Sequence, residues 1–165
     1  MTGSPPPPRE LAELLAKEAI REALYRELDA WRRRDWEAAR AGYAPGADVD
    51  LGFDVERTAE AQLARLAGSL GGAAASALLA SNVIVEVAGA SARSTALVLA
   101  THEPAAASGG RTRLEALRAE DAWTLGKDWV WRLERRALAT LWRAWLDPRR
   151  EDRAGDHRHA QEWER

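Results

Sequence analysis

The chain has 165 residues, of which 46% are hydrophobic and 30% charged, and its net charge is −2. This size suits one globular domain with its own core. A charge balance so close to neutral offers no basic surface for nucleic acid, and no apolar run approaches the roughly 20 residues that a membrane helix needs. Cysteine is absent, which excludes disulfides and zinc–thiolate sites. We therefore expect a cytoplasmic protein that binds neither nucleic acid nor membrane.

The first third of the chain has helical periodicity. Residues 1–9 are expected to be a disordered arm, because their four consecutive prolines supply no backbone donors. Apolar residues at helical spacing then predict a helix from about Glu10 to Arg34. Asp35 is a typical N-cap and predicts a short second helix over 36–41. The apolar stripe of the first helix contains Ile20, Leu24, Leu28 and Trp31.

A short strand and a third helix follow. The strand is predicted over 47–53, with Asp48 and Asp50 on one face and apolar residues on the other. The helix is predicted over 54–70, and a Gly-Gly pair ends it. The Ala-rich stretch after that pair fits either a helix or a loop.

From residue 78 onward the pattern is that of strands. Four strands are predicted, joined by a turn at 88–90, a flexible loop at 103–110 and a hairpin turn at 126–128. Beyond Pro148 the tail is charged, and we expect it to be disordered. The predicted strands cover 78–87, 91–102, 113–125 and 129–145.

Helices followed by strands predict one α+β domain over 10–146, between the arm at 1–9 and the tail at 147–165. N-terminal helices would pack on a strongly curved antiparallel β-sheet, forming a cone that encloses a pocket for a small molecule. The chain has eight tryptophans and one phenylalanine. Most tryptophans are expected to fill the core, while one or two could line the pocket for a flat, hydrophobic or aromatic ligand.

Six short segments support this layout. In chain order they are Arg34-Asp35-Trp36, Tyr43-Ala44-Pro45-Gly46-Ala47, Ser81-Asn82-Val83-Ile84-Val85-Glu86-Val87, Ala100-Thr101-His102, Gly109-Gly110-Arg111, and Trp131-Arg132-Leu133 with Arg136. Their order and spacing resemble the SnoaL-like branch of the NTF2-like superfamily over roughly residues 10–146. That resemblance implies the NTF2-like cone. It leaves the reaction open, because the fold serves polyketide cyclases, lyases, isomerases, epoxide hydrolases and non-catalytic binding domains.

The lyase branches of the family carry a catalytic Asp late in the first helix and a His on the strand before the Asn. By resemblance these positions are Arg32 and Leu78 here, so both catalytic residues are absent. Leu78 cannot accept a proton, which argues against the dehydratase and dehydrochlorinase mechanism. Arg32 would instead bind an anion or stabilise an enolate.

The polyketide-cyclase branch uses an Asp and a His from neighbouring strands inside the pocket. Here His102 ends one predicted strand and Asp121 lies on the next, so pairing of the two strands could bring them together. His102 suits proton transfer because histidine titrates near neutral pH. The alternatives are a solvent-exposed His102 at a strand end and an Asp121 that forms an ion pair at the sheet edge.

Other polar side chains are weaker candidates. Asp50, together with Asp48, is either a pocket carboxylate or part of a turn. The first helix carries a cluster of Tyr25, Asp29 and Arg32 that would either face the pocket or form a surface Asp29–Arg32 pair. Asn82 would either orient a ligand carbonyl or bind backbone.

No metal or cofactor is expected. Two of the three histidines lie in the charged tail, and no glycine-rich phosphate loop follows a strand.

Three functions follow from these candidates. The first is a cofactor-independent cyclase or isomerase of an aromatic or polyketide-like secondary metabolite, working by enolisation. The base would be Asp121 or Asp50, His102 the acid, and Arg32 with Tyr25 the oxyanion donors; Asn82, Asp29, Trp31 and Trp123 would contact substrate.

The second function is a non-catalytic binding or assembly protein, and the third is epoxide opening by Arg32 with Asp29 and Asp50. We also expect a homodimer through the outer sheet face.

Overall fold

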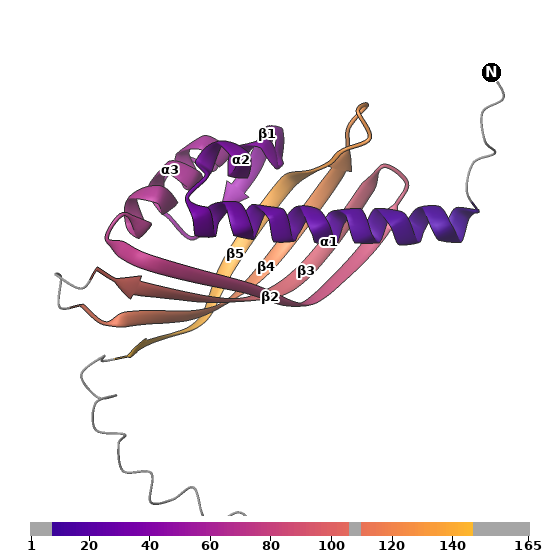
Figure 1. The fold of residues 1–165 in the computed structure, drawn as a ribbon. Helices are drawn as coiled ribbons and strands as arrows, with labels where there is room; N and C mark the ends of the chain where they lie inside the picture. The colour runs from indigo at the N-terminus through magenta and orange to yellow at the C-terminus, as the bar shows by residue number, and fades with distance from the viewer. Residues whose placement is uncertain (1–7, 106–109, 147–165) are drawn as a thin grey trace, which may run out of the picture.

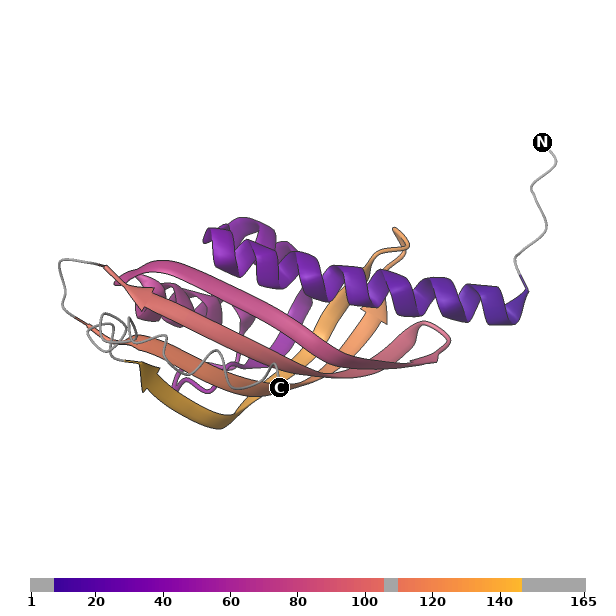
Figure 2. The same ribbon diagram turned by 60° about the horizontal axis from the view of Figure 1, so that its bottom comes forward.

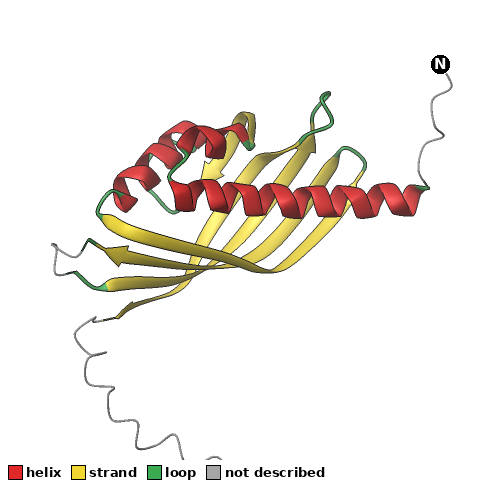
Figure 3. Cartoon of the chain, viewed as in Figure 1, coloured by secondary structure: helices red, strands yellow, loops and turns green. Residues whose placement is uncertain are grey.

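The structure is a computed structural model that describes residues 8–105 and 110–146. The expected tail at 147–165 and residues 1–7 of the expected arm lie outside the described residues. Three helices and five strands form the domain, in the order α1 Arg9–Arg33, α2 Trp36–Ala41, β1 Tyr43–Asp50, α3 Ala59–Leu70, β2 Ala73–Ala88, β3 Ser91–Pro104, β4 Thr112–Leu125 and β5 Trp131–Leu146. The predicted α+β class is confirmed (Figures 1 and 3).

The five strands form one open sheet in the order β1-β5-β4-β3-β2. All neighbouring pairs are antiparallel except β1 and β5, which are parallel, so the sheet is mixed rather than wholly antiparallel. Irregular register within β2 and between β4 and β5 accompanies a strong curvature. The helices cover the concave side of the sheet, which leaves the opposite side open (Figure 2).

Helix capping explains where the helices begin. Asp35 accepts a hydrogen bond from Ala38 N, as predicted for the N-cap of α2. The third helix begins at Ala59, five residues later than predicted, because Thr58 caps it by accepting from Ala61 N. The prediction of helix from residue 54 was therefore wrong, and the residues between β1 and Thr58 form a loop that becomes part of the site.

The Ala-rich stretch after α3 is neither helix nor loop. It is the first part of β2, where Ser76 pairs with His102 of β3. Alanine has little intrinsic preference for strands, so the long β3 edge imposes the extended conformation through its backbone hydrogen bonds. This extra length matters, because it carries β2 as far as the functional end of β3.

The core lies between α1 and the inner face of the sheet, where alternate strand residues are buried. Tryptophans divide between core and surface: Trp31, Trp123 and Trp131 are buried, while Trp129, Trp142 and Trp145 are exposed. The expectation that most of the late tryptophans fill the core was therefore wrong. No helix among the described residues is long and apolar enough to cross a membrane.

Candidate functional site: a cavity with a buried histidine

A cavity of about 120 Å³ lies at the end of the sheet where β3 leads to β4. The loop after β1, the helices α1 and α3, and the inner faces of four strands form its wall. Most lining side chains are apolar, which is typical of small-molecule sites: Trp31, Leu51, Phe53, Leu66, Leu70, Leu78, Ala100, Leu117 and Leu138. The ionisable side chains of the lining are His102, Arg113, Glu115 and Arg143.

His102 lies on the inner face of β3 and is only 8% exposed. Its Nδ1 is 2.9 Å from the hydroxyl of Ser76, and its Nε2 is 3.8 Å from Glu115 Oε2. Burial lowers the pKa of the imidazole and the Arg113 guanidinium lowers it further, while Glu115 acts in the opposite direction. At neutral pH the side chain is therefore uncharged and able to accept a proton.

Glu115 is a buried carboxylate held between two arginines. Arg143 Nε donates to Glu115 Oε1 at 2.6 Å, and Arg143 Nη2 lies equally close to the same oxygen. Arg113 Nε is 3.1 Å from the other oxygen, Oε2. Strand alternation places Arg113 and Glu115 on one face, and the register places Arg143 opposite Glu115. The cluster thus has two positive charges for one negative charge.

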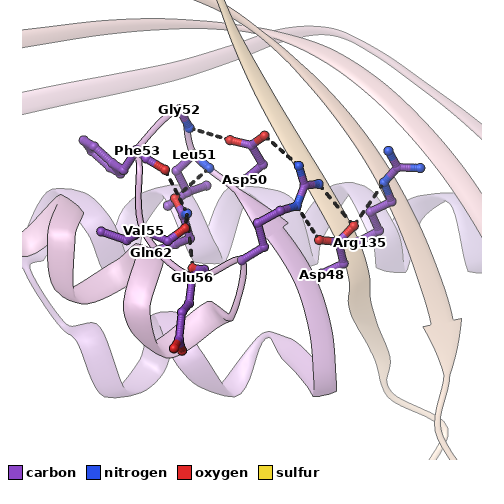
Figure 4. Close-up of polar contacts among 10 residues, drawn as sticks. Asp48, Asp50, Leu51, Gly52, Phe53, Val55, Glu56, Gln62 and Arg135 are labelled. Atoms are coloured by element: carbon purple, nitrogen blue, oxygen red, sulfur yellow. Dashed lines mark hydrogen bonds and ion pairs between the residues drawn. The ribbon is translucent and has the colours of Figure 1, made fainter.

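The loop after β1 forms one wall of the cavity and is held in shape by Gln62 of α3. Gln62 is fully buried, and its Oε1 accepts from Leu51 N at 3.0 Å while its Nε2 donates to Phe53 O at 3.2 Å (Figure 4). The same Nε2 lies 3.3 Å from the carbonyls of Val55 and Glu56. The side-chain amide of Gln62 therefore provides hydrogen-bonding partners for the loop backbone that faces inward, and it holds Leu51 and Phe53 against the cavity.

A second ionic cluster is buried between α1 and the sheet. Arg136 of β5 donates from Nε and Nη2 to the two oxygens of Asp121, both at 2.8 Å, and from Nη1 to Glu27 of α1. Arg136 is 1% exposed. Its guanidinium also lies 5.8 Å from the centre of the Trp31 ring. Trp31 also lines the cavity, so this one side chain lies between Arg136 and the cavity.

Burial governs the titration of this second cluster. It raises the pKa of Glu27 more than the nearby Arg136 lowers it. Burial acts to lower the pKa of Arg136, yet Asp121 and Glu27 raise it well above its ordinary value. Burial and the Glu27 carboxylate raise the pKa of Tyr43 well above its usual range. Buried Glu27 Oε1 and the Tyr43 hydroxyl make no hydrogen bond of normal geometry to the described residues.

Comparison with known proteins identifies the family and the fold. A sequence model of the SnoaL-like domain matches residues 12–137. The chain belongs to the SnoaL-like family. No curated protein matches the sequence.

Solved structures share the fold of this SnoaL-like chain at low sequence identity. The hexachlorocyclohexane dehydrochlorinase LinA-type3 from Novosphingobium barchaimii is 15% identical, with a TM-score of 0.72 over 84% of this chain and 95% of its own. LinA type 2 is 16% identical, with a TM-score of 0.71 over 83% and 93%. An NTF2-like protein with a cystatin-like fold from Novosphingobium aromaticivorans is 20% identical, with a TM-score of 0.67 over 80% and 86%. These identities establish the NTF2-like fold and not the reaction.

The SnoaL-like chain does not bring His102 and Asp121 together, so the expected proximity was wrong. In the β3–β4 register His102 lies opposite Arg113, whereas Asp121 lies opposite Ser94. Ser94 is eight residues from His102 along β3, which corresponds to about 26 Å at about 3.3 Å per residue. His102 is buried rather than exposed, and Asp121 forms its ion pair in the interior rather than at an edge.

The polar cluster expected on the first helix of this SnoaL-like domain lies at the surface. Arg32 donates from Nε and Nη2 to Asp29 Oδ1 at 3.0 and 2.8 Å, and Arg33 binds the other oxygen of Asp29. Tyr25 is 47% exposed. None of these side chains lines the cavity. Of the two readings weighed above, the surface Asp29–Arg32 pair is confirmed and the pocket-facing cluster is not, because the apolar stripe turns this side of the helix toward solvent.

Asp50 and Asp48 also face outward, away from the cavity. Arg57 donates from Nη1 to Asp50 Oδ2 at 3.0 Å and from Nε to Asp48 Oδ1 at 2.7 Å. Arg135 Nε lies 3.6 Å from Asp48 Oδ2 (Figure 4). Asp50 additionally accepts from Gly52 N, which is the turn role weighed above. Since Arg32 contacts Asp29 and not Asp50, the expected Arg32–Asp29–Asp50 set is not formed.

The remaining candidates divide between wall, core and surface. Trp31 lines the cavity, while Trp123 is buried in the core and donates from Nε1 to Ser94 Oγ at 2.9 Å. Asn82 is exposed at the bulge of β2 with φ of 51°, a left-handed conformation that asparagine tolerates. It does not line the cavity.

Sequence reasoning missed the residues that surround His102. Arg113, Glu115 and Arg143 carry a signal, because Arg113 and Glu115 share a face with Asp121 and lie nearest the loop that joins β3 to β4. A hairpin closed by that loop places His102 opposite Arg113. Ser76 could not be found this way, because its stretch was not assigned to a strand. No group of metal-ligating side chains occurs among the described residues.

Proposed function

We propose that this SnoaL-like protein is a cofactor-independent enzyme that moves protons on a small, mainly apolar carbonyl compound, with His102 as the base. The observation that carries the proposal is a nearly buried, uncharged imidazole in a cavity whose lining is mostly apolar and whose other ionisable side chains are Arg113, Glu115 and Arg143. Exclusion of water strengthens electrostatic interactions and protects a reactive enolate. Cyclisation or isomerisation of an aromatic or polyketide-like substrate is the reaction we favour.

The neighbours of His102 suit this role. If Nδ1–H donates to the Ser76 hydroxyl, Nε2 is free to take a proton from the carbon next to the carbonyl. Glu115, whose Oε2 lies 3.8 Å from the same Nε2, would stabilise by its negative charge the imidazolium that forms. Arg113 or Arg143 would stabilise the enolate oxygen, which replaces the role first considered for Arg32 and Tyr25. For cyclisation, the enolate carbon attacks a second carbonyl and the oxygen of that carbonyl takes the proton from the imidazolium. For isomerisation, the imidazolium returns the proton to a different carbon of the conjugated enolate.

The test is exchange of a substrate proton for deuterium. A panel of enolisable aryl ketones would be incubated in D₂O with the protein and followed by NMR. We expect His102→Gln to slow exchange by about 100-fold or more, while Glu103→Gln, an exposed neighbour on the same strand, changes it little. Wild-type protein that exchanges no ketone, or an active His102→Gln, would contradict the proposal.

A second candidate function is epoxide opening, favoured by Arg136 holding two carboxyl groups, Glu27 and Asp121. One carboxylate would take a proton from water as the water oxygen attacks an epoxide carbon. The other carboxyl group would protonate the oxygen released when the C–O bond breaks. Hydrolysis of styrene oxide that disappears in Asp121→Asn and persists in His102→Gln would favour this function over enolisation.

Non-catalytic binding is the remaining alternative, since the lyase residues are replaced by Arg32 and Leu78. It predicts that His102→Gln leaves both ligand affinity and the cellular role unchanged.

We also propose a homodimer through the outer sheet face. An apolar row crosses four paired strands there, formed by Leu79, Leu99, Ala116 and Trp142. Leu79 is 63% exposed and Trp142 is 48% exposed, and together with the row they form an apolar patch of the kind that marks an interaction surface. Light scattering should give twice the monomer mass, and Trp142→Arg should give a monomer. A wild-type monomer at micromolar concentration would contradict this interface.

A further inference from the structure

The cavity carries more positive than negative charge among its described lining residues. Arg113 and Arg143 each carry one positive charge, Glu115 carries one negative charge, and His102 is uncharged at neutral pH. Every other described lining side chain is neutral. A surplus guanidinium at the edge of an apolar cavity attracts an anion, because screening by water is weaker there than in bulk solvent.

The arginines also have hydrogen-bond donors to spare. Each guanidinium has five N–H groups. Arg143 uses Nε and Nη2 on Glu115, and Arg113 approaches Glu115 only through Nε, which is close but not aligned for a hydrogen bond. The Nη groups of Arg113 and the Nη1 group of Arg143 have no hydrogen-bonding partner among the residues that the structure describes. Planar guanidinium groups with free N–H pairs match a carboxylate in shape and charge.

We propose that the cavity binds small apolar acids, with Arg113 and Arg143 holding the ligand carboxylate and the Trp31–Phe53 side of the cavity holding its hydrocarbon part. This inference rests on the proposed function for the choice of site, and it adds the substrate class. A volume of about 120 Å³ is small beside the roughly 300–1,000 Å³ of common ligand sites. The ligand is therefore one ring or a short chain rather than a fused polycycle.

The placement of the charges also explains how such an acid would be oriented. Glu115 lies between the arginines and His102, so it repels the ligand carboxylate from the imidazole and leaves the arginines as its binding partners. The apolar end of the acid then points toward Trp31 and Leu138. A carbon next to a carbonyl in the middle of the molecule would lie near His102.

The test compares phenylacetate with phenylacetamide, which share size and shape and differ in charge. Isothermal titration of the full chain should show phenylacetate binding about tenfold more tightly or better, as expected for a charge-assisted contact. Arg143→Gln and Arg113→Gln should remove most of this difference. Arg118→Gln is the matched control, because Arg118 lies on β4 but is exposed and pairs with Glu120.

Glu115→Gln should change the affinity for phenylacetate in the opposite direction to the two arginine variants. It removes the only carboxylate among the described lining residues while keeping the shape, so phenylacetate should bind more tightly and phenylacetamide should be unaffected. Equal affinity for the acid and the amide in wild type, no binding of the acid at millimolar concentration, or an unchanged difference in Arg143→Gln would overturn the inference.

Binding and proton exchange are separate measurements, so the two proposals can fail separately. If phenylacetate binds through the arginines and His102→Gln does not alter proton exchange, the acid site stands and the proposed catalysis fails. If His102 supports exchange on neutral ketones and the acid shows no preference, the catalysis stands and the acid site fails.

Discussion

The concave face of the sheet carries two ionic clusters with opposite compositions. In the interior, Arg136 donates hydrogen bonds to two carboxyl groups, those of Glu27 and Asp121. In the cavity, the single carboxylate of Glu115 forms ion pairs with two arginines, Arg113 and Arg143. The interior cluster is almost completely buried, whereas Arg143 of the cavity cluster is 49% exposed. Trp31 lies beside Arg136 of the interior cluster and lines the cavity that holds the other cluster.

Burial decides what each cluster can do. Arg136 is engaged on three of its nitrogens and joins α1 to β4 and β5. A buried ion pair of this kind is costly to break even where it adds little net stability, because the partner charges remain without compensation. The cavity cluster keeps free donors and a neutral base at a site that a ligand can reach, and these are the features of a functional site.

The largest effect should come from breaking the interior cluster. Arg136→Gln leaves Asp121 and Glu27 buried without their cation, so we expect the free energy of unfolding to fall by about 3–5 kcal/mol. Arg143→Gln, a partly exposed arginine of the other cluster, is the matched comparison and should change stability far less. Urea denaturation of both variants measures the difference, and equal losses would show that the clusters do not differ as described.

A smaller effect on the free energy of unfolding should come from a change of pH, because folding alters the protonation of His102. Burial and then Arg113 lower its pKa, so the folded protein resists taking up a proton that the unfolded chain binds near pH 6.5. The unfolded state therefore binds more protons below that pH, and the free energy of unfolding should decrease as pH falls from 7.5 to 5.5.

His102→Gln is the control for this pH dependence. The variant should have a flatter profile than wild type over the same range when both are measured by denaturation at several pH values. Parallel profiles would mean that the environment of His102 does not suppress its protonation.

The smallest effect should come from the surface cluster of Asp48, Asp50 and Arg57. These side chains are about half exposed, and such pairs are screened by water. Arg57→Gln should shift the melting temperature much less than Arg136→Gln and should leave phenylacetate binding unchanged. A loss comparable to that of Arg136→Gln would show that this cluster does more than the geometry indicates.

Much of the fold follows from local pattern. The apolar stripe of α1, the Asp35 cap and the alternation in β3 and β4 each predict their element, because periodicity and capping act within a few residues. The start of α3 and the extra length of β2 did not follow in this way. The Thr58 cap that starts α3 is a local signal that the prediction missed. The extra length of β2 depends on pairing with β3, which acts across the chain.

The site was less predictable than the fold. His102 was identified from its residue type, and Trp31 from its place in the stripe. The partners of His102 depend on strand register, because Glu115 pairs with Ala100 of β3 while Asp121 pairs with Ser94, six residues farther along the strand. Surface candidates such as Arg32 and Asp50 were equally plausible by residue type, and only burial distinguished them.

The sequence by itself determined that this chain forms SnoaL-like helices on a sheet, and that a histidine stands at the end of one strand. Those properties arise from hydrophobic periodicity, capping and residue chemistry, which are local. The tertiary structure alone decided that Glu115, Arg113 and Arg143 surround His102 while Arg136 takes Asp121 and Glu27. The reason is that ionic partners are chosen by strand register and by burial, and both are set only when α1 and all five strands come together.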